Sequence, residues 1–406
     1  MMSPEQMLAE ADRCVKCGYC LPYCPTYALS ADEGESPRGR IALIQALIQK
    51  TVDSQRLHQH LDSCLACRAC EPACPSEVRY GQLITAVRSL QKSSGRTAGT
   101  FHRLSLYLLT RAPYIQALSG IAGSYQRLGI SALARRFGGI AVRRLHTLLP
   151  TEIKAHTWNR VYPATTTKVG RIGLFTGCIG RITDRPALLA GIRLLNHLGY
   201  EVVIPPGQRC CGAMHLHGGE QAEAEALAKI NRDAFTGQNL EAILGVATGC
   251  SARFSEYSQE GGPLPAPVMD ISSFLCNTPG LSKLELQPLE RRVALHTPCS
   301  MKNILKAGSA PQRLLQQIPG IDLQELPENG LCCGAAGLYL LNHPDNANRL
   351  REDKIKGLRQ SQAEILVTSN TGCALHMAAG IREAGMDVEV LHPVELLLRQ
   401  LSNQHY

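Results

Sequence analysis

The sequence predicts a multidomain α+β protein, in which a mainly α-helical unit is followed by two duplicated α/β units with parallel sheets. Three observations lead to this prediction. Two identical cysteine spacings occur within the first 75 residues, the cysteine pattern after Lys168 repeats itself, and short apolar strands alternate with helices in each repeat. Such alternation is typical of parallel sheets. We place the units at 1–95, 96–165, 166–290 and 291–406.

The first unit contains eight of the 17 cysteines, in two runs with the spacing C-x2-C-x2-C-x3-C-P. Bacterial ferredoxins use this spacing to hold two 4Fe-4S clusters, and the fourth cysteine of each run ligates the other cluster. Soft thiolates suit such clusters. We therefore predict an α-helical ferredoxin domain with two ligand sets: Cys14, Cys17, Cys20 and Cys74 for cluster 1, and Cys64, Cys67, Cys70 and Cys24 for cluster 2.

Disulfides and zinc account for these cysteines less well. Disulfides need an oxidising compartment, and residues 1–14 show no secretory signal, so we expect a reducing one. Zinc commonly uses C-x2-C pairs, but rarely three cysteines in one run and a fourth followed by proline. Iron-sulfur chemistry is therefore the prediction.

The stretch between the two runs has helical periodicity from Arg40 onward, with Ile41, Ile44 and Leu47 on one face. The preceding segment, Ser36-Pro37-Arg38-Gly39-Arg40, is interpreted as a turn near a cluster. Its arginines would either offset the charge of the cluster or lie in a solvated loop.

The second unit, 96–165, is interpreted as a basic helical segment. No Asp or Glu occurs between Val78 and Thr151, a stretch that carries 11 positive charges, whereas the whole chain has a net charge of +8. A basic amphipathic segment favours peripheral contact with a membrane surface or a partner. A linker with solvated arginines is the alternative, and no nucleic-acid motif accompanies the charge. No apolar run is long enough to span a membrane.

The third and fourth units form a tandem duplication, in which corresponding cysteines are offset by 121, 122 and 123 residues. Strands are expected at 171–175, 201–206 and 242–248, and again at 293–297, 321–327 and 364–369. The cysteines then follow the carboxyl ends of strands, where open α/β sheets bind ligands. The candidate metal sites are Cys178, Cys210, Cys211 and Cys250 in repeat 1, and Cys299, Cys332, Cys333, Cys373 and His376 in repeat 2.

These repeats resemble the cysteine-rich repeats of heterodisulfide reductase, which end in C-x2-C and hold a non-cubane cluster with five cysteines. Here the last position is Arg253 in repeat 1 and His376 in repeat 2. Four thiols suffice for one further ordinary cluster per repeat, or for a cluster in repeat 2 alone. A structural zinc or a remnant scaffold of buried thiols stays open. His296, three residues before Cys299, is a candidate for a residue that supports a metal ligand without binding the metal itself, and His215 and His217 are interpreted as packing or surface histidines.

The whole order of units resembles the iron-sulfur subunit of glycolate oxidase. The resemblance covers nearly all of the chain and is carried by the motifs CVKCGYCLPYCPTY, SPRGR, CLACRACEPACPSEVRY, CCGAM, TGCSARFSEY, HTPCSMKN, LCCGAAGLYLLNHPD and NTGCALHM. It implies an electron-transfer subunit without catalytic residues. A flavin on partner flavoprotein subunits would oxidise glycolate to glyoxylate, and this chain would pass the electrons to a membrane quinone from the cytoplasmic face of the inner membrane.

The residues agree with a role that leaves substrate oxidation to a partner. The chain lacks a dinucleotide fingerprint, because GLFTGCIG has its glycines at the wrong spacing. Oxidation of a 2-hydroxy acid needs a hydride acceptor, normally a flavin. The alternatives are an iron-sulfur subunit for D-lactate or glycerol-3-phosphate dehydrogenase, or a heterodisulfide-reductase-like enzyme with a catalytic cluster in the repeats.

Overall fold

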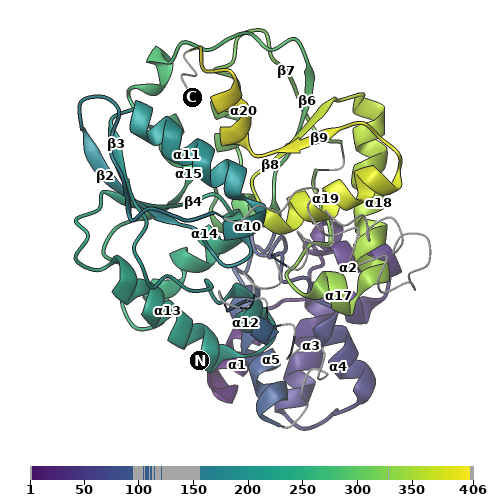
Figure 1. The fold of residues 1–406 in the computed structure, drawn as a ribbon. Helices are drawn as coiled ribbons and strands as arrows, with labels where there is room; N and C mark the ends of the chain where they lie inside the picture. Colours follow the sequence, from purple (N-terminus) through teal and green to yellow (C-terminus); the bar gives the residue numbers. More distant parts are fainter. Residues whose placement is uncertain are drawn as a thin grey trace.

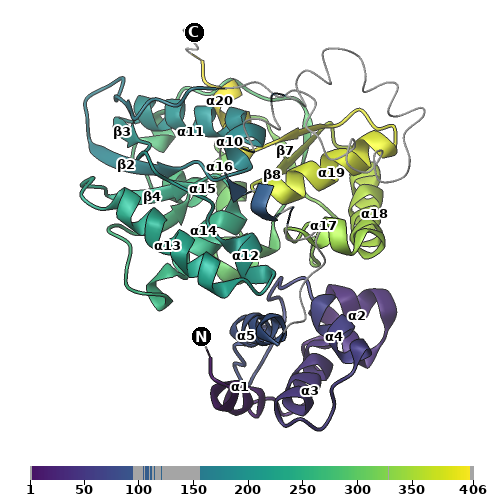
Figure 2. The same cartoon turned by 60° about the horizontal axis from the view of Figure 1, so that its bottom comes forward.

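The computed structural model describes residues 2–94, 156–327 and 329–402, and isolated positions between 104 and 120. A helical N-terminal unit lies against two α/β units, each with its own sheet (Figures 1 and 2). This arrangement confirms the predicted fold class. Most of the basic segment, including Arg96, Arg103, Arg127, Arg135, Arg136, Arg143 and Arg144, falls outside the described residues.

The N-terminal unit contains five α-helices: α1 (Pro4–Ala11), α2 (Pro25–Ser30), α3 (Pro37–Ile48), α4 (Gln55–Asp62) and α5 (Tyr80–Ser93). Local sequence explains where they begin, since Ser3, Ser36 and Ser54 each accept a backbone hydrogen bond at the start of α1, α3 and α4. Apolar residues from four of these helices form one core, which includes Met7, Ile41, Ile44, Leu57, Leu61, Leu83 and Ile84.

The predicted turn before α3 is in fact its first turn. Ser36 caps the helix, and Pro37 occupies the first helical position, where its missing N–H costs nothing. A Cβ atom at Gly39 would lie 1.8 Å from the Glu33 carbonyl oxygen, so glycine is required there by close backbone approach. Gly39, which suggested a turn, is therefore needed for close packing, and Arg40 lies on helix α3.

Repeat 1 is built on a five-stranded sheet with the order β1-β3-β2-β4-β5. The strands are β1 (Val161–Tyr162), β2 (Gly170–Phe175), β3 (Tyr200–Val203), β4 (Ala242–Gly245) and β5 (Val268–Asp270). All neighbours are parallel except β1, which pairs antiparallel with β3. Strand β1 lies within the range assigned to the basic segment, so the sheet begins before residue 166. Its helices are α10 (Gly180–Thr183), α11 (Arg185–His197), α12 (Ala213–His217), α13 (Gln221–Phe235), α14 (Thr248–Ser255) and α15 (Ile271–Cys276).

Repeat 2 has a four-stranded parallel sheet with the order β7-β6-β8-β9. Its strands are β6 (Arg292–His296), β7 (Asp322–Glu325), β8 (Ile365–Thr368) and β9 (Glu389–Leu391). Its helices are α16 (Ala310–Leu315), α17 (Tyr339–Asn342), α18 (Pro344–Ser361), α19 (Thr371–Glu383) and α20 (Pro393–Arg399), and a π-helical turn covers Ser300–Ile304. The short strands β5 and β9 were absent from the prediction, because three residues show no periodicity.

The two repeats share a hydrophobic core. Helix α11 of repeat 1 packs on α20 of repeat 2, and α15 packs on α16 (Figure 2). Leu174, Leu188, Leu295, Val367 and Leu397, from both sheets and their helices, belong to one buried cluster. Each large apolar side chain that is fully buried stabilises the folded state by about 2 kcal/mol. The shared core therefore fixes the two repeats against each other.

Three basic residues that were expected on the basic surface form ion pairs or hydrogen bonds with other described residues. Arg79 forms a bridge to the buried carboxylate of Glu10, with Nη2 2.6 Å from Oε2. Arg88 donates to the carbonyls of Leu61, Asp62 and Cys64, and Lys92 pairs with Glu220. None of the helices within the described ranges is long and apolar enough to cross a membrane.

Candidate metal centres

The eight cysteines of the N-terminal unit line two adjoining cavities. The first is lined by Cys14, Cys17, Cys20, Cys70 and Cys74. The second is lined by Cys24, Cys64, Cys67 and Cys70. Each cavity includes the four thiols that the exchanged-cysteine spacing assigns to one cluster, and Cys70 lines both. Soft donors in groups of four fit a 4Fe-4S cluster.

Unusual backbone conformations aim these sulfurs. In each run, the second residue between the first two cysteines is left-handed, with φ of 57° at Lys16 and 50° at Ala66. The residue after the second cysteine is also left-handed, with φ of 89° at Gly18 and 57° at Arg68. Non-glycine residues in this region carry strain, which persists at functional sites that over-determine it. Because the backbone adopts the same conformation in both runs, both runs have the same spacing of cysteines.

The two cavities differ in depth. Cys17 is exposed and Cys14, Cys20 and Cys74 are half-buried, whereas Cys24, Cys64 and Cys70 are buried and Cys67 is half-buried. Cluster 1 would therefore lie near the surface, and cluster 2 in the interior.

Arg40 lines the deeper cavity together with Arg68, and it is only 1% exposed. Its Nη1 lies 4.0 Å from the Cys24 sulfur, and its Nη2 pairs with Glu35 at 2.5 Å. Despite burial, neighbouring anionic groups, Cys64 first among them, raise the pKa of the Arg40 guanidinium, so it is charged. A fixed cation here would offset the negative charge of a thiolate-bound cluster.

In repeat 1 the four predicted cysteines converge. Cys178 follows β2, Cys210 and Cys211 precede α12, and Cys250 lies in the first turn of α14. The Cys178 and Cys210 sulfurs are 3.5 Å apart. Hydrogen bonds from the Cys210 and Cys250 thiols hold the pKa of the Cys211 thiol well below its usual value. Four thiols that share protons in this way are suited to binding a cation.

In repeat 2 the corresponding thiols also converge. The Cys299 and Cys332 sulfurs are 4.0 Å apart, and Cys333 hydrogen-bonds with Cys332 and Cys373. Glycine follows both Cys-Cys pairs because the backbone is left-handed there, with φ of 84° at Gly212 and 89° at Gly334. A Cβ atom at Gly334 would also lie 2.7 Å from the Ala347 carbonyl oxygen.

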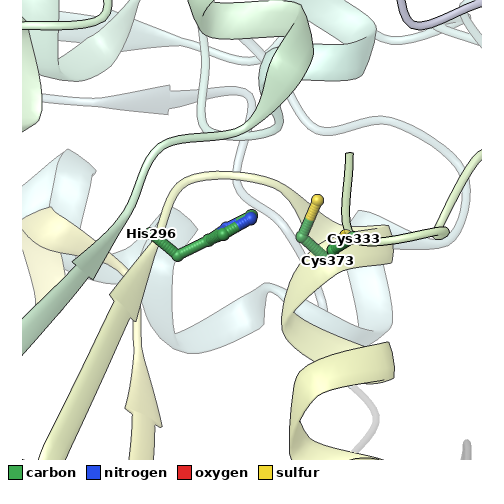
Figure 3. A group of neighbouring side chains, drawn as sticks. All are labelled: His296, Cys333 and Cys373. Atoms are coloured by element: carbon green, nitrogen blue, oxygen red, sulfur yellow. The ribbon is translucent and has the colours of Figure 1, made fainter. Parts of the chain in front are cut away.

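The histidine that joins the repeat 2 site is His296 rather than His376. A ring nitrogen of His296 and the sulfurs of Cys333 and Cys373 all lie within 4.8 Å of one another (Figure 3). His376, the predicted fifth donor, is not in this group, and its Nε2 lies 3.1 Å from the Ala347 carbonyl oxygen. Residue His376 lies on α19, whereas His296 ends β6 and faces the thiols from the sheet.

Further histidines near the repeats have structural partners. His215 is buried, with Nδ1 2.8 Å from Glu220 Oε2 and Nε2 3.2 Å from Thr110 Oγ1. This agrees with the packing role expected for it. Burial lowers the pKa of His217 to about 4, so this side chain is neutral near pH 7.

The cavity assigned to cluster 2 and the repeat 2 site are in direct contact, a relationship that the sequence did not reveal. Asn303 donates a hydrogen bond from Nδ2 to the Cys67 carbonyl oxygen at 2.9 Å. Leu65, Cys332 and Tyr339 belong to one buried cluster, against which Cys67 and Cys299 pack. Burial raises the pKa of the Cys67 thiol well above its usual value, and Cys299 raises it further.

Comparisons with known proteins agree with this architecture. Residues 10–78 match the 4Fe-4S dicluster domain family, and 172–255 and 293–378 match the cysteine-rich domain family. All eight ferredoxin-type cysteines and both sets of four repeat cysteines fall within these ranges. The chain is therefore an iron-sulfur electron-transfer protein that carries multiple clusters.

Full-length relatives identify the family. The chain is 31% identical to the probable glycolate oxidase iron-sulfur subunit of Bacillus subtilis, covering 95% of this chain and 93% of that protein. It is 30% identical to the glycolate oxidase iron-sulfur subunit of Escherichia coli, over 96% and 94%. The chain belongs to the family of glycolate oxidase iron-sulfur subunits.

A more distant relative shares the same extent. One of the subunits of the dihydromethanophenazine:CoB–CoM heterodisulfide reductase of Methanosarcina barkeri is 24% identical, covering 97% of this chain and 95% of that protein. The resemblance between the repeats and those of heterodisulfide reductase therefore extends along nearly the whole chain.

Proposed function

We propose that this chain is the electron-transfer subunit of a flavin-dependent glycolate dehydrogenase complex. A flavoprotein partner oxidises glycolate to glyoxylate, and this chain carries the electrons toward a membrane quinone. The observation that supports this most is the sorting of eight cysteines into two adjoining cavities, of which the deeper one contacts repeat 2. The names of the relatives support glycolate as the substrate.

Each ligand set has a distinct task in this proposal. Cys14, Cys17, Cys20 and Cys74 hold cluster 1, and Cys24, Cys64, Cys67 and Cys70 hold cluster 2. When bound, such clusters accept and release single electrons at potentials set by charge, hydrogen bonds and burial. Arg40 supplies charge beside Cys24, and Tyr80 donates a hydrogen bond to the Cys64 sulfur at 3.7 Å.

Electrons enter on the face around cluster 1. Large apolar side chains are exposed there, with Val15 69% and Tyr19 67% accessible. They line the shallower cavity beside the exposed Cys17. Exposed apolar groups of this kind mark interaction surfaces. We assign this face to the flavoprotein subunit.

Electrons leave toward the membrane, to which the basic segment attaches the complex at the cytoplasmic face. Eight of the 11 positive charges between Val78 and Thr151 lie in this segment, at Arg96, Arg103, Arg111, Arg127, Arg135, Arg136, Arg143 and Arg144. Each basic residue close to an anionic leaflet contributes about 1 kcal/mol of attraction. The attachment is therefore expected to weaken at high salt.

Co-purification tests the proposal. The tagged chain, isolated anaerobically from its own host, should bring down a flavoprotein, and the mixture should reduce a dye with glycolate while the chain alone does not. Tyr19→Ser should reduce the recovered flavin, whereas Val169→Ser, at a side chain 60% exposed next to β2, should not. Glycolate-dependent dye reduction by the chain alone would contradict a relay role.

A further inference from the structure

We propose that His296 is a ligand to an iron-sulfur cluster in repeat 2, and that repeat 1 has no counterpart of this ligand. This inference builds on the proposed relay, but its test needs neither glycolate nor a flavoprotein.

The geometry at His296 is that of a metal ligand. One ring nitrogen lies with the Cys333 and Cys373 sulfurs inside a 4.8 Å group, and all three residues are buried. The other side of the ring is engaged, because Nδ1 lies 2.9 Å from Thr368 Oγ1. Metal-binding histidines characteristically bond through their second nitrogen, which fixes ring orientation and tautomer. Nε2 is therefore the atom that faces the sulfurs.

The number of donors supports the same assignment. Repeat 2 contains Cys299, Cys332, Cys333 and Cys373, and His296 makes a fifth donor. Histidine replaces cysteine on one iron in some iron-sulfur proteins and raises the potential of the cluster. His296 thus supplies the additional donor for which the sequence suggested His376.

Repeat 1 has no histidine at the position that corresponds to His296. His296 is three residues before Cys299, and the residue three before Cys178 is Phe175. Phe175 packs against the ring of Phe254, with centroids 4.3 Å apart, in an apolar cluster beside Cys211. Thr368, the partner of His296, corresponds in the strand register to Gly245. Both His296 and its hydrogen-bond partner Thr368 are therefore replaced in repeat 1, by residues whose side chains cannot bind metal.

Nearby polar residues around the repeat 2 site also suit an anionic centre. Asn370 Nδ2 lies 3.3 Å from the Cys373 sulfur, and the matching position in repeat 1 is Ala247. Hydrogen bonds to the sulfurs would further raise the potential of the cluster.

The experiment is pulsed electron paramagnetic resonance on the full chain, labelled with ¹⁵N-histidine and purified anaerobically. Spectra are recorded as isolated and after dithionite reduction. The eight ferredoxin-type ligands are cysteines, so a strong coupling from a directly bound histidine nitrogen would come from the repeats. We expect this coupling in the unmodified chain, and its loss in His296→Phe, which imitates repeat 1, and in His296→Gln, which keeps a polar side chain.

His376→Gln is the matched control, since it changes a buried histidine of the same repeat that bonds to a backbone carbonyl. It should retain the coupling. Iron per chain should fall in the His296 variants and not in the control. The proposal is overturned if no directly bound histidine nitrogen is seen in either state, or if the coupling persists in both His296 variants.

Discussion

Asn303 of repeat 2 donates a hydrogen bond to the backbone carbonyl of Cys67, a predicted ligand of cluster 2, at 2.9 Å. The two residues are 236 positions apart in the sequence. The bond joins the ferredoxin-type unit to repeat 2, whose Cys299 packs with Cys67 against one buried cluster that contains Cys332. In the proposed relay, this bond marks the junction at which the ferredoxin-type unit meets repeat 2.

Asn303→Leu removes this bond with little change in side-chain volume. A buried acceptor left without its donor costs about 1–3 kcal/mol, and the junction between the two units should loosen. We expect slower glycolate-dependent quinone reduction with unchanged iron content. The control is Asn277→Leu, because Asn277 donates a similar bond to the Ser273 carbonyl on an exposed turn. Equal rates in both variants would show that the junction does not govern transfer.

Cys67→Ala and Cys24→Ser test the exchanged ligand sets, since these residues come from different runs but border the same cavity. Each variant should lose about four iron atoms, the content of one cubane cluster, and all electron transfer to quinone. Cys276→Ala, at a lone cysteine whose thiol bonds to the Ala310 carbonyl, should lose neither. Quinone reduction that survives the loss of cluster 2 would exclude the relay.

Arg40→Met removes the buried cation beside Cys24 and its ion pair with Glu35, which keeps hydrogen bonds with His60 and Ser63. Loss of one member of a buried ion pair destabilises by about 3–5 kcal/mol, and these remaining bonds should keep the loss near the lower end of that range. The potential of cluster 2 should also become more negative, because a positive charge favours the reduced state. A redox titration followed by electron paramagnetic resonance measures this shift. Arg40→Lys, which preserves the charge, should shift the potential less; an equal shift would mean that charge is not the cause.

Asp270 gives the stability of repeat 1 a pH dependence. Burial raises the pKa of this carboxyl to about 7, and its Oδ2 has no hydrogen-bond partner among the residues that the structure describes. Because the folded pKa exceeds the unfolded one, the folded state is favoured at about pH 4 and loses stability as pH rises to about 7. The loss amounts to as much as about 4 kcal/mol.

Asp270→Asn should remove this dependence while retaining the cap of α15, since asparagine caps helices as well as aspartate. Anaerobic urea unfolding at pH 5 and pH 8 measures the effect, and the variant should gain more stability relative to the unmodified chain at pH 8 than at pH 5. Asp233→Asn, at an exposed carboxylate paired with Lys229, serves as the control. An equal gain at both pH values would assign the effect to something other than ionisation.

The sequence predicted the parts of this molecule that depend on local spacing. The paired cysteine runs, the duplicated Cys-Cys-Gly motif and most of the strands could be recognised because each depends on neighbouring residues. The turn before α3 was mispredicted since Gly39 suggested punctuation, whereas it allows the close approach of the Glu33 carbonyl. Sequence alone could not show that a helix would carry Arg40 to Cys24.

The missed features of the sites depend on distant parts of the chain. His376 was chosen as a donor because it takes the place of a cysteine in the resembling repeats, but α19 directs it to the Ala347 carbonyl. His296 has a local signal, its place three residues before Cys299, although only pairing of β6 with β8 brings it to Thr368 and Cys373. The Asn303–Cys67 bond has no signal in the sequence at all.

The decisive measurement follows the clusters when substrate is added. The tagged chain is purified anaerobically from its own host with its bound partners, glycolate is added, and cluster reduction is recorded by electron paramagnetic resonance. We expect a reduced-cluster signal with glycolate, and its loss when the flavoprotein is removed. No signal with glycolate, despite full reduction by dithionite, would contradict glycolate as the electron source and favour D-lactate, glycerol-3-phosphate or disulfide chemistry.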